Sequence, residues 1–152
     1  MQTHQIPKRP WSVLATEIFN LHSTDYYVLV DCYSDFVGVS KLTDTTSVSV
    51  IQEFRQQFSR HGIPDVLLSH NVPQFTSYEF REFASQWEFK HVSSSPHHHK
   101  ANGNAEATIE TVKSLFKKAT PNNQDPWMAL LDYRNTPTEG KGTSSIQRLC
   151  SK

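Results

Sequence analysis

The chain has few of the features that mark secreted, membrane-spanning or redox-active proteins. It contains two cysteines in 152 residues, Cys32 inside an apolar run and Cys150 near the end, which are too few for a disulfide framework or a four-cysteine zinc site. No apolar run approaches the roughly 18–20 residues of a membrane span, and the polar start lacks the apolar stretch of a secretory signal. We therefore expect a soluble, intracellular protein without membrane contact.

Net charge is also absent, because Lys plus Arg number 15 and Asp plus Glu number 15. This balance excludes a generally polycationic nucleic-acid coat, although it leaves room for a local basic face. Residues 1–89 carry six basic and ten acidic side chains, whereas residues 90–152 carry nine and five. The second half is thus the part able to face phosphates, and an unevenly charged solvated surface explains the same asymmetry equally well.

Aromatic residues are plentiful, with nine Phe, five Tyr and three Trp. Each buries roughly 150–250 Å² in a folded core, and a chain of this length makes one domain. We predict a linker over residues 1–10, a domain core over residues 11–138 and a C-terminal extension over residues 139–152.

Hydrophobic periodicity predicts three strands followed by alternating helices and strands. The first strands span residues 11–19, 25–33 and 36–42, and their short connections indicate an antiparallel meander. The further elements expected are a helix ending at Gly62, a strand at 65–69, a helix capped by Ser77, a strand at 89–92, a loop at 93–101, a long helix, and a last helix after Pro126. This order predicts an α/β fold with a mixed five-stranded sheet, antiparallel in its first three strands and then extended by parallel strands, flanked by helices.

The long helix has the clearest pattern in the chain. Its apolar residues alternate steps of four and three, which is the core-facing stripe of an amphipathic helix. They are Ala105, Ile109, Val112, Phe116 and Ala119.

Two short motifs carry the chemical information. Residues 69–75 read SHNVPQF and residues 102–106 read NGNAE, with 35 residues between His70 and Glu106. In this order and spacing the chain resembles the catalytic core of retroviral and gypsy-type LTR-retrotransposon integrases. Those cores carry an Asp in a first-strand motif like residues 11–19, a second Asp in D-N-G-P-Q-F, and a Glu in N-G-x-A-E.

Further phrases extend the resemblance over about residues 10–149, namely HGIP at 61–64, SPH at 95–97 and YRNTP at 133–137. The resemblance implies a ribonuclease-H-like fold and an enzyme that processes and joins DNA ends by two-metal phosphoryl transfer. It implies Mg²⁺ or Mn²⁺ as cofactor, DNA as partner, and a homodimer or higher oligomer. It also implies a nuclear site of action, for which the sequence contains no targeting signal.

By resemblance, Glu17, His70 and Glu106 occupy the catalytic positions, with Glu17 and Glu106 as the metal ligands. Two Mg²⁺ ions about 3.5–4 Å apart need hard carboxylate oxygens, so three departures from the family pattern matter. Glu17 replaces an Asp and moves its carboxylate outward by roughly 1 Å, and His70 replaces the second Asp by an imidazole better suited to Zn²⁺ or Mn²⁺. Val72 replaces the motif's Gly and is strained if that position requires a positive φ.

We therefore expect an integrase core that is inactive or severely impaired, and whether the chain is an enzyme stays open. The alternative is a catalytically silent DNA-binding or dimerisation module derived from a retroelement integrase. A nuclease of the same fold, unrelated to retroelements, is a weaker third reading. Whether the copy is decayed, domesticated or engineered is open as well.

A row of polar side chains near Glu106 suggests DNA contact. Lys113 and Lys117 follow it by seven and eleven residues, close to one helix face, and Lys100 and Asn102 precede it on the expected loop. By resemblance, this helix and loop contact DNA, and all four residues are predicted to bind it. Ordinary exposed ion pairs explain Lys113 and Lys117 as well.

Several local patterns have competing explanations. Asp31 and Asp35 are candidates to substitute for the ligand lost at His70, although the family's ligands do not fall there. The histidines at 97–99, with His70 and His91, suggest zinc, but no spacing matches a structural zinc motif and a solvated loop explains them. Glu106 and Glu110 also suit the first turn of a helix through its dipole. If the core pairs through helices, the side chains at the interface include Phe54, Phe80 or Trp87.

Overall fold

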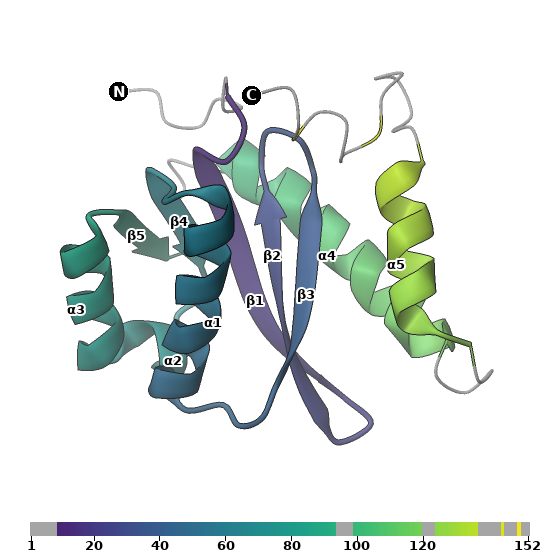
Figure 1. The fold of residues 1–152 in the computed structure, drawn as a ribbon, viewed down its shortest axis with the longest axis horizontal. Coiled ribbons are helices and arrows are strands. Elements are labelled where there is room, and N and C mark those ends of the chain that lie inside the picture. Colours follow the sequence, from purple (N-terminus) through teal and green to yellow (C-terminus); the bar gives the residue numbers. More distant parts are fainter. Residues whose placement is uncertain (1–8, 94–98, 120–123, 137–143, 145–148, 150–152) are drawn as a thin grey trace.

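The computed structural model describes residues 9–93, 99–119, 124–136, 144 and 149, and for residues 99–102 the backbone alone. Its centre is a sheet of five strands in the order β3-β2-β1-β4-β5 (Figure 1). The strands are β1 (Val13–Leu21), β2 (Thr24–Asp31), β3 (Val37–Leu42), β4 (Val66–Ser69) and β5 (Lys90–Ser93). β1, β2 and β3 pair antiparallel, whereas β4 is parallel to β1 and to β5. The mixed sheet predicted from the sequence is confirmed.

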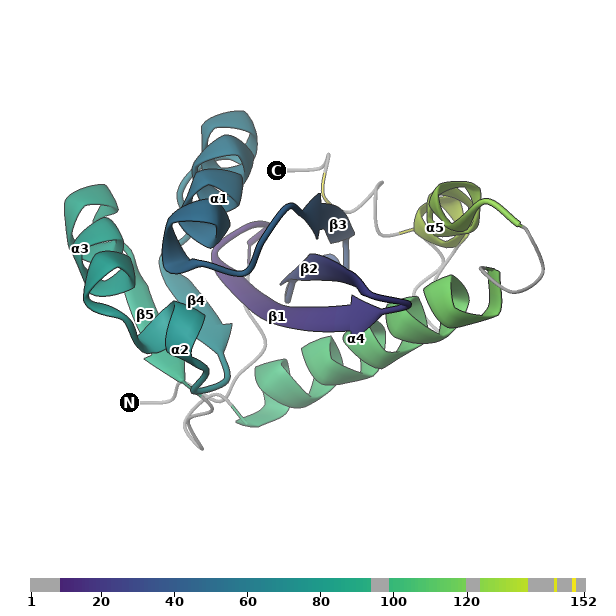
Figure 2. The ribbon, with the colours of Figure 1, turned by 90° about the horizontal axis from the view of Figure 1, so that it is seen from below.

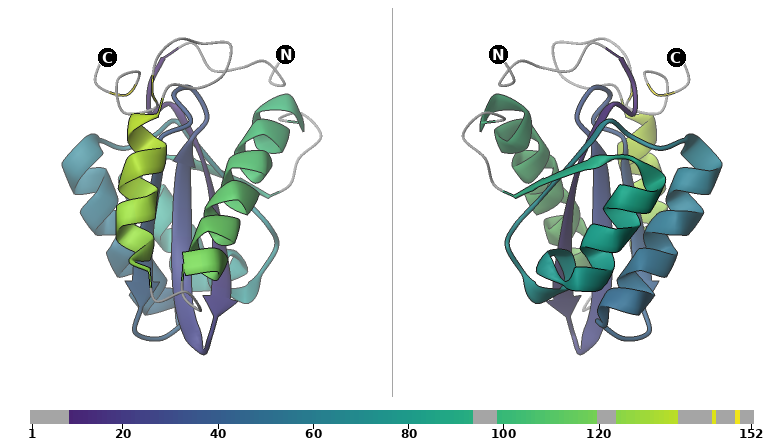
Figure 3. Two further views of the ribbon diagram at one scale, coloured as in Figure 1. Left: turned by 90° about the vertical axis from the view of Figure 1, so that its right-hand side faces the viewer. Right: turned by 90° about the vertical axis from the view of Figure 1, so that its left-hand side faces the viewer.

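Two layers of helices enclose the sheet. On one face lie α1 (Ser47–His61), the short α2 (Pro73–Thr76) and α3 (Tyr78–Trp87), and on the other lie α4 (His99–Ala119) and α5 (Pro126–Asn135) (Figures 2 and 3). A separate cluster of buried side chains fills the space beneath each layer. Among the described residues, no helix is long and apolar enough to cross a membrane.

The ends of α1 follow from its sequence. Thr46 caps the first turn, because its side-chain oxygen accepts a hydrogen bond from the Ser49 backbone N–H at 3.2 Å. Gly62 ends the helix at φ 103°, and its N–H donates to the Phe58 carbonyl at 2.8 Å. A positive φ is accessible to Gly at little cost, so the predicted end of this helix is confirmed.

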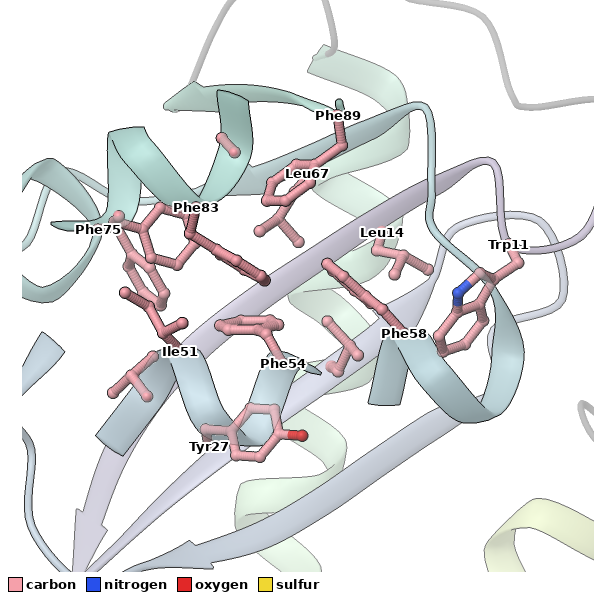
Figure 4. Packing of buried hydrophobic residues seen from close by; sticks show 14 of the residues in the cluster. Trp11, Leu14, Tyr27, Ile51, Phe54, Phe58, Leu67, Phe75, Phe83 and Phe89 are labelled. Carbon is pink, nitrogen blue, oxygen red and sulfur yellow. The ribbon is translucent and has the colours of Figure 1, made fainter. Parts of the chain in front are cut away.

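Aromatic rings dominate the core beneath α1 and α3 (Figure 4). The Phe54 ring centroid lies 5.4–6.1 Å from four others, those of Tyr27, Phe58, Phe75 and Phe80. Phe54 and Phe80 have no exposed surface, because both rings are buried in the core of the domain. The suggestion that they lie at a dimer interface is therefore wrong. Trp87 is partly buried and packs against the same cluster.

The stripe predicted for the long helix faces the sheet. All five of its apolar residues are buried, each with no more than 2% of its surface exposed. Phe116 packs edge-on against Phe19, Tyr26 and Trp127, at centroid distances of 5.2–6.5 Å. Because this stripe is buried against the sheet, it determines which residues of α4 remain at the surface.

Some boundaries differ from those predicted. The helical turn α2 was not expected, and Pro73 at its first position explains it, because the ring fixes φ near the helical value. α4 begins at His99, within the loop predicted over residues 93–101. Most of that loop, residues 94–98, lies outside the described residues.

The chain ends are described only in part. Residues 1–8 of the predicted linker and most of the predicted extension lie outside the described residues. Leu149, however, is 7% exposed and belongs to the aromatic core. Arg134 in α5 donates from Nε to the Val37 carbonyl at 2.8 Å, which ties α5 to β3.

Candidate active site

Three elements bring the predicted catalytic residues together. Glu17 lies in β1, His70 directly follows β4, and Glu106 lies in α4. The His70 Nε2 atom is 3.5 Å from Glu106 Oε2 and 4.0 Å from Glu17 Oε1. His70 therefore stands between the two carboxylates, and all three side chains reach one partly exposed surface.

The sheet register explains this meeting. β1 and β4 are parallel, with Leu14 opposite Leu67 and Ala15 opposite Leu68. Two residues further along, the same register sets Glu17 beside His70, where the strand has ended. Because β4 ends at Ser69 while β1 continues to Leu21, Glu17 lies beside the first residue after the shorter strand.

α4 supplies the third residue from below the sheet. Ala105 and Ile109 are buried against β1 and β2, at 1% and 2% exposure. Glu106 follows Ala105 and is thereby rotated out of the interface by about 100° on a helix of 3.6 residues per turn. Its side chain is 46% exposed and reaches the edge where His70 lies.

Lys113 is also part of this cluster. Its Nζ atom contacts Glu17 Oε2, lies 3.3 Å from Glu110 Oε2, and stands 5.8 Å from the centroid of the Phe19 ring. Burial lowers the pKa of Lys113, but the hydrogen bonds and negative charges of Glu17 and Glu110 outweigh burial and raise it overall. Lys113 is therefore charged at neutral pH, and its partner is a carboxylate of the chain.

A shallow groove continues from Lys113 along α4. It is lined by Phe19, Asn20 and Leu21 of the first strand and by Glu110, Lys113, Ser114 and Lys117 of the helix. Lys100 and Asn102 lie in the first turn of α4, and their side chains are outside the described residues. The structure thus places Lys113 and Lys117 in one groove beside Glu17, which is where the predicted DNA contacts would lie.

Val72 adopts an ordinary conformation. Its φ is −114° and its ψ is 157°, which is extended backbone open to β-branched residues. The hypothesis of strain at this position is wrong, because the turn before α2 does not use a positive φ here. Val72 instead packs against the aromatic core and lines a pocket beside Glu17 and His70.

Asp31 is a structural carboxylate and no substitute ligand. It has no exposed surface, and it accepts hydrogen bonds from the backbone N–H groups of Trp11 at 2.9 Å and Tyr33 at 3.2 Å and from the Ser34 hydroxyl at 2.7 Å. Burial raises its pKa, although these hydrogen bonds act in the opposite direction. Asp35 sits in the turn that Asp31 stabilises, with φ 63° and its N–H donating to the Asp31 carbonyl.

The contact between Ser69 and His91, close to the site, could not be predicted from any motif or spacing in the sequence. His91 Nε2 and Ser69 Oγ are 2.6 Å apart, which links β5 to β4 immediately before His70. Ser69 Oγ also donates to the His70 carbonyl at 3.1 Å. Burial lowers the pKa of His91, so this imidazole is neutral at pH 7, and its partner is the Ser69 hydroxyl. Among the described side chains it joins no group of three or more potential metal ligands, and the side chains of residues 97–99 lie outside the described part of the chain.

The donor set does not fit a pair of Mg²⁺ ions. The three predicted catalytic side chains are two carboxylates and an imidazole, and one oxygen of Glu17 is held by Lys113. Within the described part of the chain, no group of three or more His, Cys, Asp or Glu side chains is arranged to hold a metal ion. Near-octahedral Mg²⁺ demands oxygen ligands that this arrangement lacks.

Comparison with known proteins gives both sequence relatives and structural neighbours. The Gag-Pro-Pol polyprotein of mouse mammary tumor virus (strain BR6) is 27% identical over 113 residues, which cover 74% of this chain and 6% of the polyprotein. The catalytic core domain of BIV integrase superposes with a TM-score of 0.78 at 16% identity, covering 93% of this chain and 95% of that one. The HTLV-2 integrase catalytic core domain, in a dimeric form in complex with magnesium, superposes with a TM-score of 0.75 at 23% identity, covering 95% and 99%.

These structural matches show an integrase-type, ribonuclease-H-like fold. The integrase core domain family matches residues 7–99, which include β1 with Glu17 and the β4 end with His70. This chain therefore belongs to the integrase core domain family.

Proposed function

We propose that this chain is a DNA-binding integrase core whose strand-processing and strand-transfer chemistry is lost or severely impaired. The observation that carries the proposal is the position of His70, whose Nε2 lies within 4.0 Å of carboxylate oxygens of both Glu17 and Glu106. In the family pattern the residue at this point is an Asp. An imidazole there removes a negative charge from the centre of the site.

The chemistry explains why this substitution matters. Two-metal phosphoryl transfer uses carboxylates to hold both ions and so to bind the attacking and the leaving oxygen together. An HTLV-2 relative is a core in complex with magnesium, and we propose that Mg²⁺ or Mn²⁺ is the ion that an active form of this chain would use. With His70 in place, Glu17 and Glu106 are the remaining ligands, and they are too few for two divalent cations.

The first experiment restores the family's ligands. Cleavage and strand transfer on a branched DNA substrate are measured in Mg²⁺ and in Mn²⁺ for the chain, for Glu17→Asp/His70→Asp, and for that variant carrying Glu106→Gln. We expect a silent chain, an active double variant and a dead control. Val72 needs no change, because its backbone is unstrained. Mg²⁺-dependent cutting by the unmodified chain that requires Glu106 would disprove the loss of activity.

The groove beside Glu17 favours the second candidate, a catalytically silent DNA-binding module. Lys113 and Lys117 place two ammonium groups along one groove, and each phosphate contact makes binding fall with salt. We expect Lys117→Gln to weaken DNA binding by about tenfold and to reduce its salt dependence, as measured by fluorescence anisotropy. Lys118→Gln is the matched control, because Lys118 follows Lys117 but does not line this groove. Equal effects of the two variants would reject the groove as the DNA-binding surface.

Oligomerisation is proposed on the same footing. The HTLV-2 relative is a dimeric form, and here α5 exposes Met128 at 56% and Leu131 at 45%. We propose a homodimer or higher oligomer that acts on nuclear DNA. Light scattering on the chain and on Met128→Glu/Leu131→Glu tests the assembly: a dimeric mass that falls to a monomeric one supports it, and a monomeric mass at all concentrations contradicts it.

A further inference from the structure

A cation of the chain already occupies Glu17, the residue in the family's first metal-ligand position. Lys113 Nζ contacts Glu17 Oε2, and the two side chains are only 28% and 20% exposed. Glu110 holds the same ammonium from the solvent side, at 3.3 Å. The ring of Phe19 lies 5.8 Å from Nζ and adds a cation–π contact.

We propose that Lys113 is the built-in counter-cation of Glu17, so that the ion pair between β1 and α4 takes the place of a bound divalent cation. The negative charge of Glu17 is balanced by the Lys113 ammonium, so the site needs no metal ion to be stable. The inference concerns the same site as the proposed function, but it does not rest on DNA binding or on strand transfer.

Side-chain length is part of the reason for this pairing. Glu17 carries one methylene more than the family's Asp, which extends its carboxylate by roughly 1 Å toward a partner. The contact spans 96 positions of the sequence, and it joins a strand and a helix that are fixed by separate parts of the core. Because α4 is held by its buried stripe, Lys113 is kept at Glu17 without any ligand between them.

Charge decides the competition with a metal ion. A divalent cation at Glu17 must displace an ammonium that is held by two carboxylates, and the displaced ammonium then stays within a few ångströms of the incoming charge. The other nearby ligand, Glu106, faces the His70 imidazole at 3.5 Å. Removing the Lys113 charge should therefore strengthen metal binding at Glu17 more than removing the Lys117 charge further along the groove.

Binding of Mn²⁺ alone, followed by the electron paramagnetic resonance signal of the free ion, tests the inference without DNA. The variants are Lys113→Gln, which removes the cation, Lys113→Arg, which keeps it, and Lys117→Gln as the control in the same groove. We expect the unmodified chain, Lys113→Arg and Lys117→Gln to leave the Mn²⁺ signal unchanged at millimolar ion. We expect Lys113→Gln to reduce it, and Glu17→Gln/Lys113→Gln to abolish the reduction. Equal Mn²⁺ binding by the unmodified chain and Lys113→Gln, or a gain that persists without Glu17, would overturn the proposal.

Thermal unfolding in EDTA tests the pair itself. Glu17→Gln and Lys113→Gln should each lower Tm by about 1–4 °C, and the double variant should lower it by no more than the larger single change. In millimolar Mn²⁺ the Tm of Lys113→Gln should rise, while that of the unmodified chain stays constant. Strictly additive losses in EDTA would show that the two side chains do not interact and would reject the proposal even if DNA binding is observed.

Discussion

At the scale of single residues, the role of each carboxylate is set by the side chain or backbone group beside it. Glu17 meets Lys113, Glu106 faces His70, and Asp31 is enclosed by three hydrogen-bond donors. These carboxylates have similar intrinsic chemistry, so their surroundings give them different roles. Glu17 and Glu106 lie at an exposed edge where a ligand can reach them, whereas Asp31 is part of the scaffold.

Asp31 offers a test of that scaffold role. Asp31→Ala should lower the free energy of unfolding by about 2–4 kcal/mol, because it removes the carboxylate that accepts from the buried Trp11 N–H, from the Tyr33 N–H and from the Ser34 hydroxyl. Asp31→Asn should cost much less, since an amide oxygen accepts the same backbone bonds. Urea denaturation followed by circular dichroism measures both values. Similar losses for the two variants would contradict this account of the hydrogen bonds.

The same residue predicts a pH dependence. Burial raises the pKa of Asp31 in the folded state, so the folded chain keeps the proton at pH values where the unfolded chain has released it. The stability contributed by this proton is present below the unfolded pKa and is lost as pH rises through the folded pKa. The free energy of unfolding of the unmodified chain, minus that of Asp31→Asn, should therefore increase as pH falls from 7 toward 4. A constant difference would contradict the raised pKa.

At the scale of elements, caps and apolar stripes set where each helix begins, ends and packs. α1 runs between Thr46 and Gly62, and α4 is held by a buried stripe that runs from Ala105 to Ala119. The position of α4 matters most for function, because this helix carries Glu106 and the two lysines of the groove, Lys113 and Lys117. Its orientation depends on the buried side of the helix, and the chemistry depends on the opposite side.

Truncation of the α4 stripe should be costly. Phe116 has no exposed surface and contacts three aromatic rings, so Phe116→Ala should lower the free energy of unfolding by about 3–5 kcal/mol. Leu115→Ala is the control on the same turn, because Leu115 is only half-buried, and it should cost clearly less. Denaturant unfolding of both variants gives the comparison, and equal losses would show that α4 does not pack as described.

Two glycines test the end of α1 against an ordinary strand position. Gly62 has φ 103° and nothing within 4 Å of an added Cβ, so Gly62→Ala should cost about 1 kcal/mol through backbone strain alone. Gly38 in β3 has equal space and no positive φ, and Gly38→Ala should be neutral or slightly stabilising. Thermal unfolding distinguishes the two, and a loss at Gly38 equal to that at Gly62 would refute the conformational explanation.

At the scale of the whole molecule, one sheet is shared by two cores. The aromatic core beneath α1 and α3 contains Trp11, whereas Trp127 packs on Phe116 in the core beneath α4 and α5. Since both faces of the same strands are buried, neither layer has a sheet of its own. Loss of one layer exposes one face of the strands on which the other layer packs.

We therefore predict a single cooperative unfolding transition. Urea curves recorded by far-ultraviolet circular dichroism and by tryptophan fluorescence should coincide. Trp127→Phe leaves Trp11 and Trp87 as reporters of the layer beneath α1 and α3, whereas Trp11→Phe/Trp87→Phe leaves Trp127 as the reporter of the other layer. Each variant should give the same midpoint by both probes. A fluorescence transition of one layer at lower urea than the loss of secondary structure would show that the layers unfold independently.

Most of the fold was accessible from the sequence, because its elements follow local rules. The strand and helix order, the cap at Gly62 and the buried stripe of α4 each depend on residues within a few turns of one another, and all are confirmed. The short helix α2 and the start of α4 at His99 were missed, since both lie in polar stretches where turn propensities compete. The assignment of Phe54 and Phe80 to an interface failed because periodicity shows that a ring is buried but does not show against what.

The sequence alone determined the spacing of Glu17, His70 and Glu106 along the chain, and the resemblance predicts that two of them stand where the family has Asp. Only the tertiary structure decided that Val72 is unstrained, that Asp31 belongs to the scaffold, and that Lys113 pairs with Glu17 across 96 positions. The physical reason is range. Chain spacing and local conformation depend on neighbouring residues, whereas the partner of a charge depends on how a strand and a helix are packed by the core between them.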